Sequence, residues 1–102
     1  MERAQLIEQI ESQLAGRGEL TESRILDGDG YFIDGHLVVA VMGSDLCVDV
    51  GRQVWDAALA SDGVRPLLFA DQPVPGWVMI DGGSLSSNES VSHWIETSLA
   101  RR

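Results

Sequence analysis

The first fifteen residues carry apolar side chains at the spacing of an α-helix. Leu6, Ile7, Ile10 and Leu14 fall on one face, and charged or amide side chains occupy most other positions. Gly16 follows as a helix stop signal. We therefore predict an amphipathic helix over residues 2–15.

Beyond Glu22 the pattern changes to short runs rich in β-branched and aromatic residues, which is typical of strands. These runs cover residues 23–26, 31–33, 36–42 and 46–50. Asp34-Gly35 is a two-residue hairpin signal, because both residues tolerate the positive φ that such a turn requires. A second reversal at residues 43–45 completes a predicted antiparallel meander.

The second half of the chain predicts a helix at residues 54–59, strands at 65–69 and 77–81, and a closing helix. Pro73 and Pro75 oppose ladder pairing, so residues 70–76 are predicted to form a loop. Ser86 and Glu89 have the spacing of a capping box at the start of the last helix. Its apolar face holds Val91, Trp94, Ile95 and Leu99.

The predicted order is therefore helix, three or four strands, helix, two strands, helix. No internal repeat or linker interrupts it, so residues 1–102 are expected to form one α+β domain with a mainly antiparallel sheet.

Charge and cysteine content narrow the function classes. Seven basic residues against sixteen acidic ones give a net charge of -9, which opposes binding to the phosphates of nucleic acids. One cysteine, Cys47, excludes an internal disulfide and fits a reducing compartment. The N-terminal residues lack the apolar core of a signal peptide, and no apolar run approaches the ~20 residues of a membrane span. We expect a cytoplasmic protein that binds neither nucleic acid nor membrane.

Several segments, in this order and spacing, resemble the TfoX N-terminal domain family over about residues 24–99. They are Tyr31 to His36, Asp45 to Gly51, Trp55 to Leu59, Gly63 to Phe69, Pro75 to Val78 and His93 to Ile95. The resemblance implies the order helix, three strands, helix, two strands, helix, a fold similar to that of type III secretion chaperones. It also implies a role in competence or transcription regulation through a protein partner. The chain departs from the family pattern at residues 24–28, where an aromatic residue is lost and an acid gained, and at Arg52-Gln53.

Candidate chemistry is sparse. Asp27-Gly28-Asp29-Gly30 is similar to part of a calcium loop, but the spacing puts Ile25 and His36 where carboxylate ligands belong, so a turn is the preferred interpretation. His36 and His93 have no second histidine or cysteine at ligand spacing. A nucleophile set built from Ser44, His36 and Asp34 would crowd into one hairpin. We predict a non-enzymatic protein with no metal site, no cofactor and no small-molecule substrate.

The pattern of one predicted strand indicates a surface that could bind another protein chain. Residues 37–42 are apolar at every position, which a sheet with helices on one face and water on the other would not require. Either helices cover both faces, or the second face binds a homodimer mate or another protein. Trp77 begins a strand after the predicted proline loop, so it could pack on the core or anchor a partner. The candidate partner-binding residues are Trp77, Val38, Ala40 and Met42.

The sequence thus predicts a cytoplasmic protein-interaction or regulatory module of the TfoX type. The alternative is a secretion-chaperone-like protein that holds a segment of a client.

Overall fold

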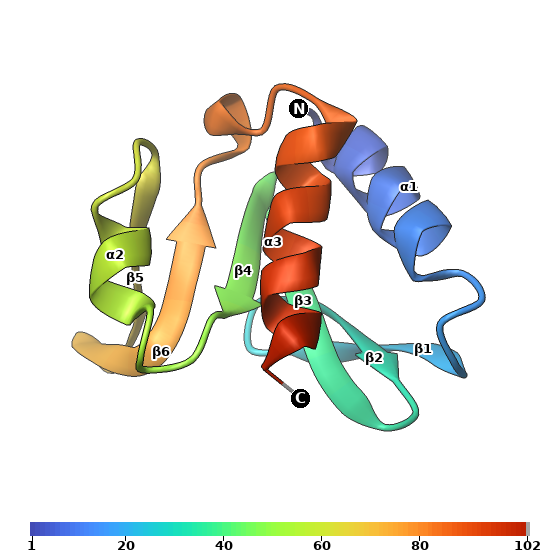
Figure 1. Ribbon diagram of the computed structural model, residues 1–102, viewed down its shortest axis with the longest axis horizontal. Coiled ribbons are helices and arrows are strands. Elements are labelled where there is room, and N and C mark those ends of the chain that lie inside the picture. Colours follow the sequence, from blue (N-terminus) through green and yellow to red (C-terminus); the bar gives the residue numbers. More distant parts are fainter. Residues whose placement is uncertain (102) are drawn as a thin grey trace.

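A computed structural model describes residues 1–101 and places three α-helices against one antiparallel sheet (Figure 1). The elements in chain order are α1 (Arg3–Leu14), β1 (Leu20–Ile25), β2 (Gly28–Ile33), β3 (His36–Met42), β4 (Asp45–Asp49), α2 (Trp55–Leu59), β5 (Val64–Phe69), β6 (Gln72–Ile80), a 3-10 turn η1 (Gly82–Ser84) and α3 (Asn88–Ala100). The α+β class and the antiparallel sheet are confirmed. Four strands precede α2, one more than the TfoX resemblance implies, because β1 and β2 form a hairpin of full length.

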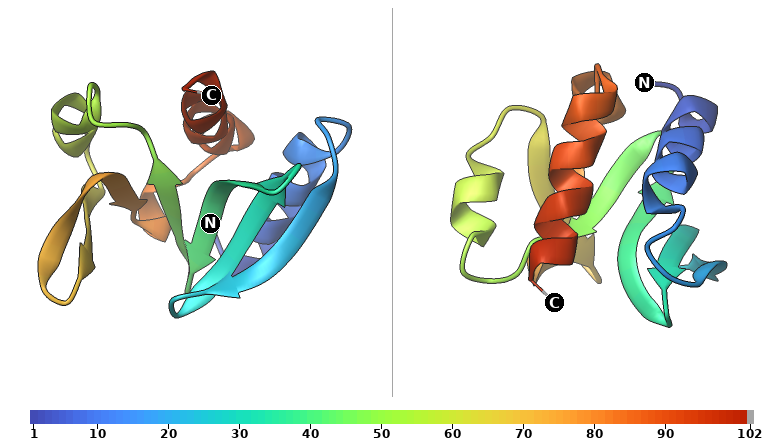
Figure 2. Two further views of the ribbon diagram at one scale, coloured as in Figure 1. Left: turned by 90° about the horizontal axis from the view of Figure 1, so that it is seen from below. Right: turned by 45° about the vertical axis from the view of Figure 1, so that its right-hand side comes forward.

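The six strands lie in the order β1-β2-β3-β4-β6-β5, and every neighbouring pair is antiparallel. All three helices contribute to one apolar core on one side of this sheet, with α3 lying over β3 and β4. The left view of Figure 2 shows α2 and α3 on that side, while the turns of the β1-β2 and β5-β6 hairpins project on the other. Of the two arrangements left open by the sequence, helices therefore cover one face only. We call the other side of the sheet the open face.

The predicted hairpin at Asp34-Gly35 is confirmed. Ile33 pairs with His36, and the two turn residues have φ of 50° and 83°, as a two-residue turn with both central residues at positive φ requires.

A β-bulge in β3 redirects Val38. Tyr31 pairs with Val39 and Phe32 with Leu37, so Val38 is skipped by the register. The Ser98 hydroxyl of α3 donates to the Val38 carbonyl at 2.7 Å, and Ser98 is fully buried. The bulge therefore turns Val38 toward the helices and is held there by a buried hydrogen bond.

Three local predictions are wrong. Residues 72–76 belong to β6 and do not form a loop. Pro73 pairs with Leu68 where β6 has only β5 beside it, so the missing proline N–H deprives no second strand of a hydrogen bond. The helix cap is Ser87, whose hydroxyl accepts from the Ser90 N–H at 3.2 Å, one residue after the serine predicted from the sequence.

The third wrong prediction is the turn at residues 27–30. Only Leu26 and Asp27 turn the chain, and Gly28 already pairs with Ile25. A Cβ on Gly28 would lie 2.2 Å from the Val41 carbonyl oxygen, so this strand residue is a glycine because β3 approaches its backbone.

Candidate functional site

The open face carries an apolar groove between the two projecting hairpin turns. Its volume is about 340 Å³. The lining side chains are all apolar in character and come from five of the six strands and the β1-β2 turn: Ile25, Leu26, Leu37, Met42, Cys47, Leu67, Phe69, Val74 and Trp77. We call this surface the groove.

The groove has a packed floor of its own. Ala40, Cys47, Leu67 and Met79 form a second buried cluster that contains no helix residue. The Ile25 and Leu37 side chains pack over Gly30 of β2, where a Cβ would meet both of them at 3.1 Å. The floor of the groove is therefore closely packed.

The two sides of the groove are apolar hairpin tips. Leu26 lies in the β1-β2 turn and is 53% exposed, and Phe69 ends β5 and is 62% exposed. Leu26 has φ of 50°, and the β5-β6 turn residues Ala70 and Asp71 have φ of 51° and 64°. Positive φ costs a residue such as leucine or alanine roughly 1–2 kcal/mol relative to glycine. Apolar, strained residues thus stand where glycine or asparagine would stabilise the turn.

An ion pair lies at each end of β4. Arg65 reaches Asp45 at 2.7 Å, and the Gly82 N–H donates to the same carboxylate at 2.9 Å. Burial alone would raise the pKa of Asp45, but the hydrogen bonds from Arg65 and Gly82 outweigh it and lower that pKa. Asp49 pairs with Arg101 at 3.0 Å near the other end of β4.

Cys47 lies in the floor and is 1% exposed. Burial, with a smaller contribution from the nearby Asp49 charge, raises the pKa of its thiol to about 12. A thiol that stays protonated is a poor nucleophile, so Cys47 acts as a small packing residue at neutral pH.

The predicted partner-binding residues do not all reach this surface. Met42 and Trp77 line the groove, and Ala40 lies fully buried beneath it. The placement of Val38 on this face is wrong: it is fully buried in the helix-side core because of the bulge. Sequence reasoning missed Leu26 and Phe69, and the available signal was an apolar residue beside a turn in each case.

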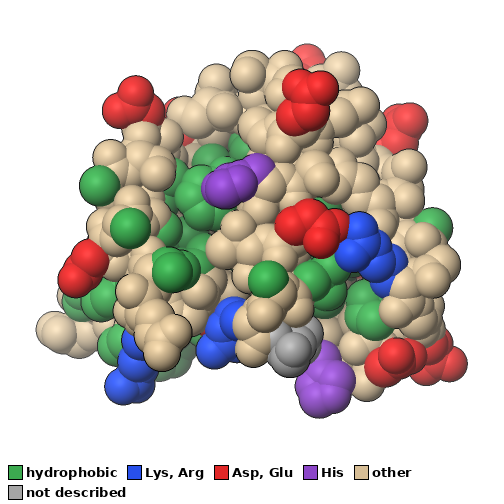
Figure 3. Space-filling view, viewed as in Figure 1, with side chains coloured by type: hydrophobic (Ala, Val, Ile, Leu, Met, Phe, Trp, Pro, Cys, Tyr) green, Lys and Arg blue, Asp and Glu red, His purple; other side chains and the backbone are tan. Residues whose placement is uncertain are grey.

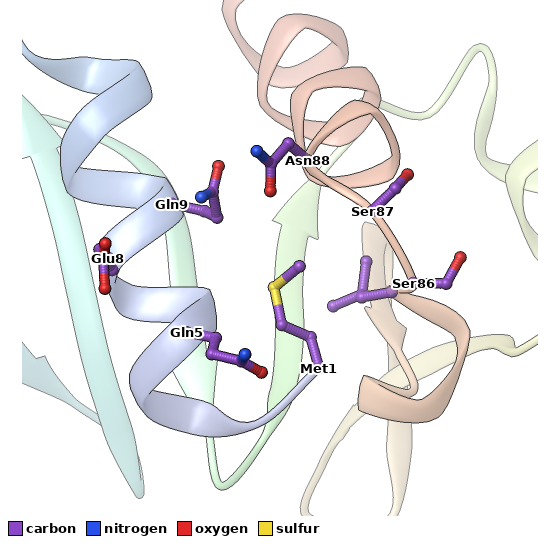
Figure 4. A pocket seen from close by; sticks show the side chains of 8 residues that line it. Met1, Gln5, Glu8, Gln9, Ser86, Ser87 and Asn88 are labelled. Carbon is purple, nitrogen blue, oxygen red and sulfur yellow. The ribbon is translucent and has the colours of Figure 1, made fainter.

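Other depressions lie on the helix side. A groove of about 300 Å³ between α2 and α3 includes Val54, Trp94, His93 and Thr97, and Figure 3 shows apolar side chains gathered between these helices. A crevice of about 390 Å³ lies between α1 and the start of α3, and Figure 4 shows Gln5, Gln9 and Asn88 around it. Within residues 1–101 no buried side-chain polar atom lacks a hydrogen-bond partner, so neither depression holds a buried polar side-chain atom that is unpaired.

Within the part of the chain that the structure describes, no three His, Cys, Asp or Glu side chains cluster closely enough to hold a metal ion. None of the helices there has the length and apolar character to span a membrane. Asp29, part of the calcium-like motif, is paired with Arg3.

Fold and site together define an α+β domain with a helix-covered face and an open apolar face. Comparisons with models of protein families, with curated proteins and with solved structures find no match to this chain.

Proposed function

We propose that this protein is a non-enzymatic interaction module that binds a segment of another protein in the groove. The observation that carries the proposal is the pair of exposed apolar tips, Leu26 and Phe69, on either side of a groove whose lining side chains are apolar. Isolated exposed apolar residues are ordinary on protein surfaces, but a contiguous apolar depression is typical of an interaction site.

The placement of the helices supports the same proposal. All apolar helix faces are used on one side of the sheet, so the second cluster around Met79 is covered only by strand side chains such as Met42 and Trp77. A partner segment would remove Leu26, Phe69 and Trp77 from water, and the hydrophobic effect would supply most of the binding free energy.

The regulatory role implied by the TfoX resemblance stays a prediction, as does the chaperone-like alternative. Both roles use a surface that binds a protein segment, so the groove suits either one. They differ in the partner: a transcription component supports regulation, and a secreted client supports the chaperone role.

Site-specific photocrosslinking in the source cell tests the proposal. The photoreactive amino acid p-benzoylphenylalanine is placed at Phe69, and in a matched control at Leu68, which is 55% exposed but does not line the groove. We expect an adduct with another protein from position 69 only, and its loss when Met42→Glu places a charge in the groove. Equal adduct yields from positions 68 and 69 would contradict the proposal.

A further inference from the structure

We infer that the segment bound in the groove is an amphipathic helix whose apolar stripe is flanked by lysine or arginine side chains. This inference rests on the proposed function and adds the secondary structure and the charge of the partner segment. Three features of the groove lead to it: its lack of hydrogen-bonding groups, its size and the charge at its tips.

The groove offers almost nothing to a partner's backbone. Among its lining side chains only the Trp77 indole and the Cys47 thiol carry a polar hydrogen. The floor residues Ala40 of β3 and Cys47 of β4 are paired with a strand on both sides. Residues 72–76 of β6 have only β5 beside them, and the prolines at 73 and 75 have no backbone N–H to donate to a partner. An extended segment laid there would bury backbone N–H and C=O groups without partners, at a cost of about 1–3 kcal/mol each. A helix satisfies these groups internally, so it can present side chains alone.

The size of the groove fits the side chains of one helical stripe. A cavity of about 150 Å³ accepts one benzene molecule, so the groove volume of about 340 Å³ accommodates roughly two large apolar side chains. Residues three or four apart on a helix lie about 5–6 Å from each other on one face. Two anchors at that spacing would fill the depression between Leu26 and Phe69.

The charge at the tips favours a basic segment. Asp27 and Asp71 are exposed, one in each projecting turn, and neither forms an ion pair with another residue of the described chain. Arg65 is already paired with Asp45, and Arg24 lies on the side of β1 opposite to Ile25. Flanking lysine or arginine residues would therefore meet uncompensated carboxylates on a chain of net charge -9.

A second copy of this chain has no free amphipathic helix to place in the groove. The apolar stripes of α1 and α3 are buried in the helix-side core, so neither helix can be offered to another copy without unfolding. Two open faces placed against each other would also bring four tip aspartates together without a basic counterpart.

The test uses three synthetic 18-residue peptides and the intact protein. The first is a helical peptide with leucines on one face and lysines beside them, the second replaces the lysines with glutamates, and the third shuffles the first to an alternating, strand-forming pattern. Binding is measured by titration calorimetry, and circular dichroism follows the peptide's helicity. We expect the basic helical peptide to bind tightest, to gain helix content on binding, and to lose affinity as salt screens its charge.

Protein variants then locate the binding. Phe69→Ser removes a side chain of which 62% is exposed, so we expect about 5- to 20-fold weaker binding. Leu68→Ser is the matched control, with 55% exposure outside the groove, and its affinity should stay within about twofold. Thermal unfolding of each variant checks that the fold is retained.

The other outcomes separate the two proposals. If the alternating or the glutamate peptide binds as tightly as the basic helix, and Phe69→Ser weakens that binding, the inferred helix is wrong while the groove stands as a binding surface. If light scattering shows a dimer that Phe69→Ser converts to a monomer, the occupant is a second copy and the inference is overturned. If no peptide binds, the inference fails, and the crosslinking at position 69 decides separately whether the proposed function fails with it.

Discussion

Leu26→Asn should make the fold more stable and the binding weaker, which a purely structural leucine would not do. Leu26 has φ of 50°, a conformation that asparagine adopts more easily than leucine. Relief of part of the roughly 1–2 kcal/mol strain should raise the free energy of unfolding by about 0.5–1 kcal/mol. For a domain of about 100 residues this corresponds to a rise in Tm of about 2–8 °C.

The same substitution removes binding surface. Full burial of a leucine side chain is worth about 1.5–3 kcal/mol, and 53% of Leu26 is still exposed before binding. If the partner covers all of that remainder, the loss is about 0.8–1.6 kcal/mol, or about 4- to 15-fold in Kd. Opposite signs for stability and affinity are the signature of a residue retained for binding at the expense of the fold.

Calorimetric unfolding and titration with the basic helical peptide measure the two effects in one preparation. Leu68→Asn is the matched control, because Leu68 has similar exposure, does not line the groove and has no positive φ. We expect no gain in Tm and no loss of affinity from it. The reasoning about strain is refuted if Leu26→Asn lowers Tm, and the contact is refuted if its affinity equals that of the unmodified protein.

Two further predictions concern the buried groups. Ser98→Ala removes the hydroxyl that donates to the Val38 carbonyl, so it should lower the free energy of unfolding by about 1–3 kcal/mol relative to the control Ser92→Ala. Ser92 lies in the same helix and its side chain forms no hydrogen bond with the described chain. Equal denaturation midpoints for the two variants would count against the role of the hydrogen bond at the bulge. Cys47 has a thiol pKa raised from 9.0 to about 12, so the unfolded chain loses this proton first and stability should fall between pH 9 and 12 by up to about 1.4 kcal/mol per pH unit. Denaturation across this range should show a shallower decline for Cys47→Ala, and identical slopes would contradict the raised pKa.

The elements that the sequence predicts well are those whose signals are local. The Asp34-Gly35 turn needs only two residues to specify its backbone, and α1 needs only its own apolar stripe. The cap of α3 shows the limit of such signals. Ser86 and Ser87 are adjacent and chemically alike, and only the packing of the helix selects the second of them.

The errors arise where pairing across the sheet decides the structure. The apolar run Leu37–Val41 hides the bulge, because no polar residue marks the position at which alternation fails and Val38 changes face. The prolines of β6 indicate a loop when only the sequence is considered. In the structure, residues 72–76 of β6 have only β5 beside them, so the prolines deprive no second strand of a hydrogen bond. Both facts depend on long-range partners, which periodicity along one segment does not report.

The groove could be predicted only in part for the same reason. The sequence marks Met42 by its apolar strand and Trp77 by its place after two prolines, whereas Leu26 and Phe69 come from hairpins at opposite ends of the sheet. Strand order alone brings these two tips to the two sides of one depression. A sequence pattern can mark each tip as unusual, but the sheet topology is needed to see that they form one site.

The departures from local sequence rules therefore point to the same surface. A leucine occupies a turn position that favours glycine, and a phenylalanine stays mostly in water. Each departure costs the isolated domain some stability, through strain or exposed apolar area. On the helix side the apolar stripes of α1 and α3 are buried in the main core, and Val54 is 45% exposed. Strain at Leu26 and exposed apolar area at Leu26 and Phe69 lie on one face, and one bound segment would offset both, which is the physical basis of the proposal that this protein binds its partner on the open face.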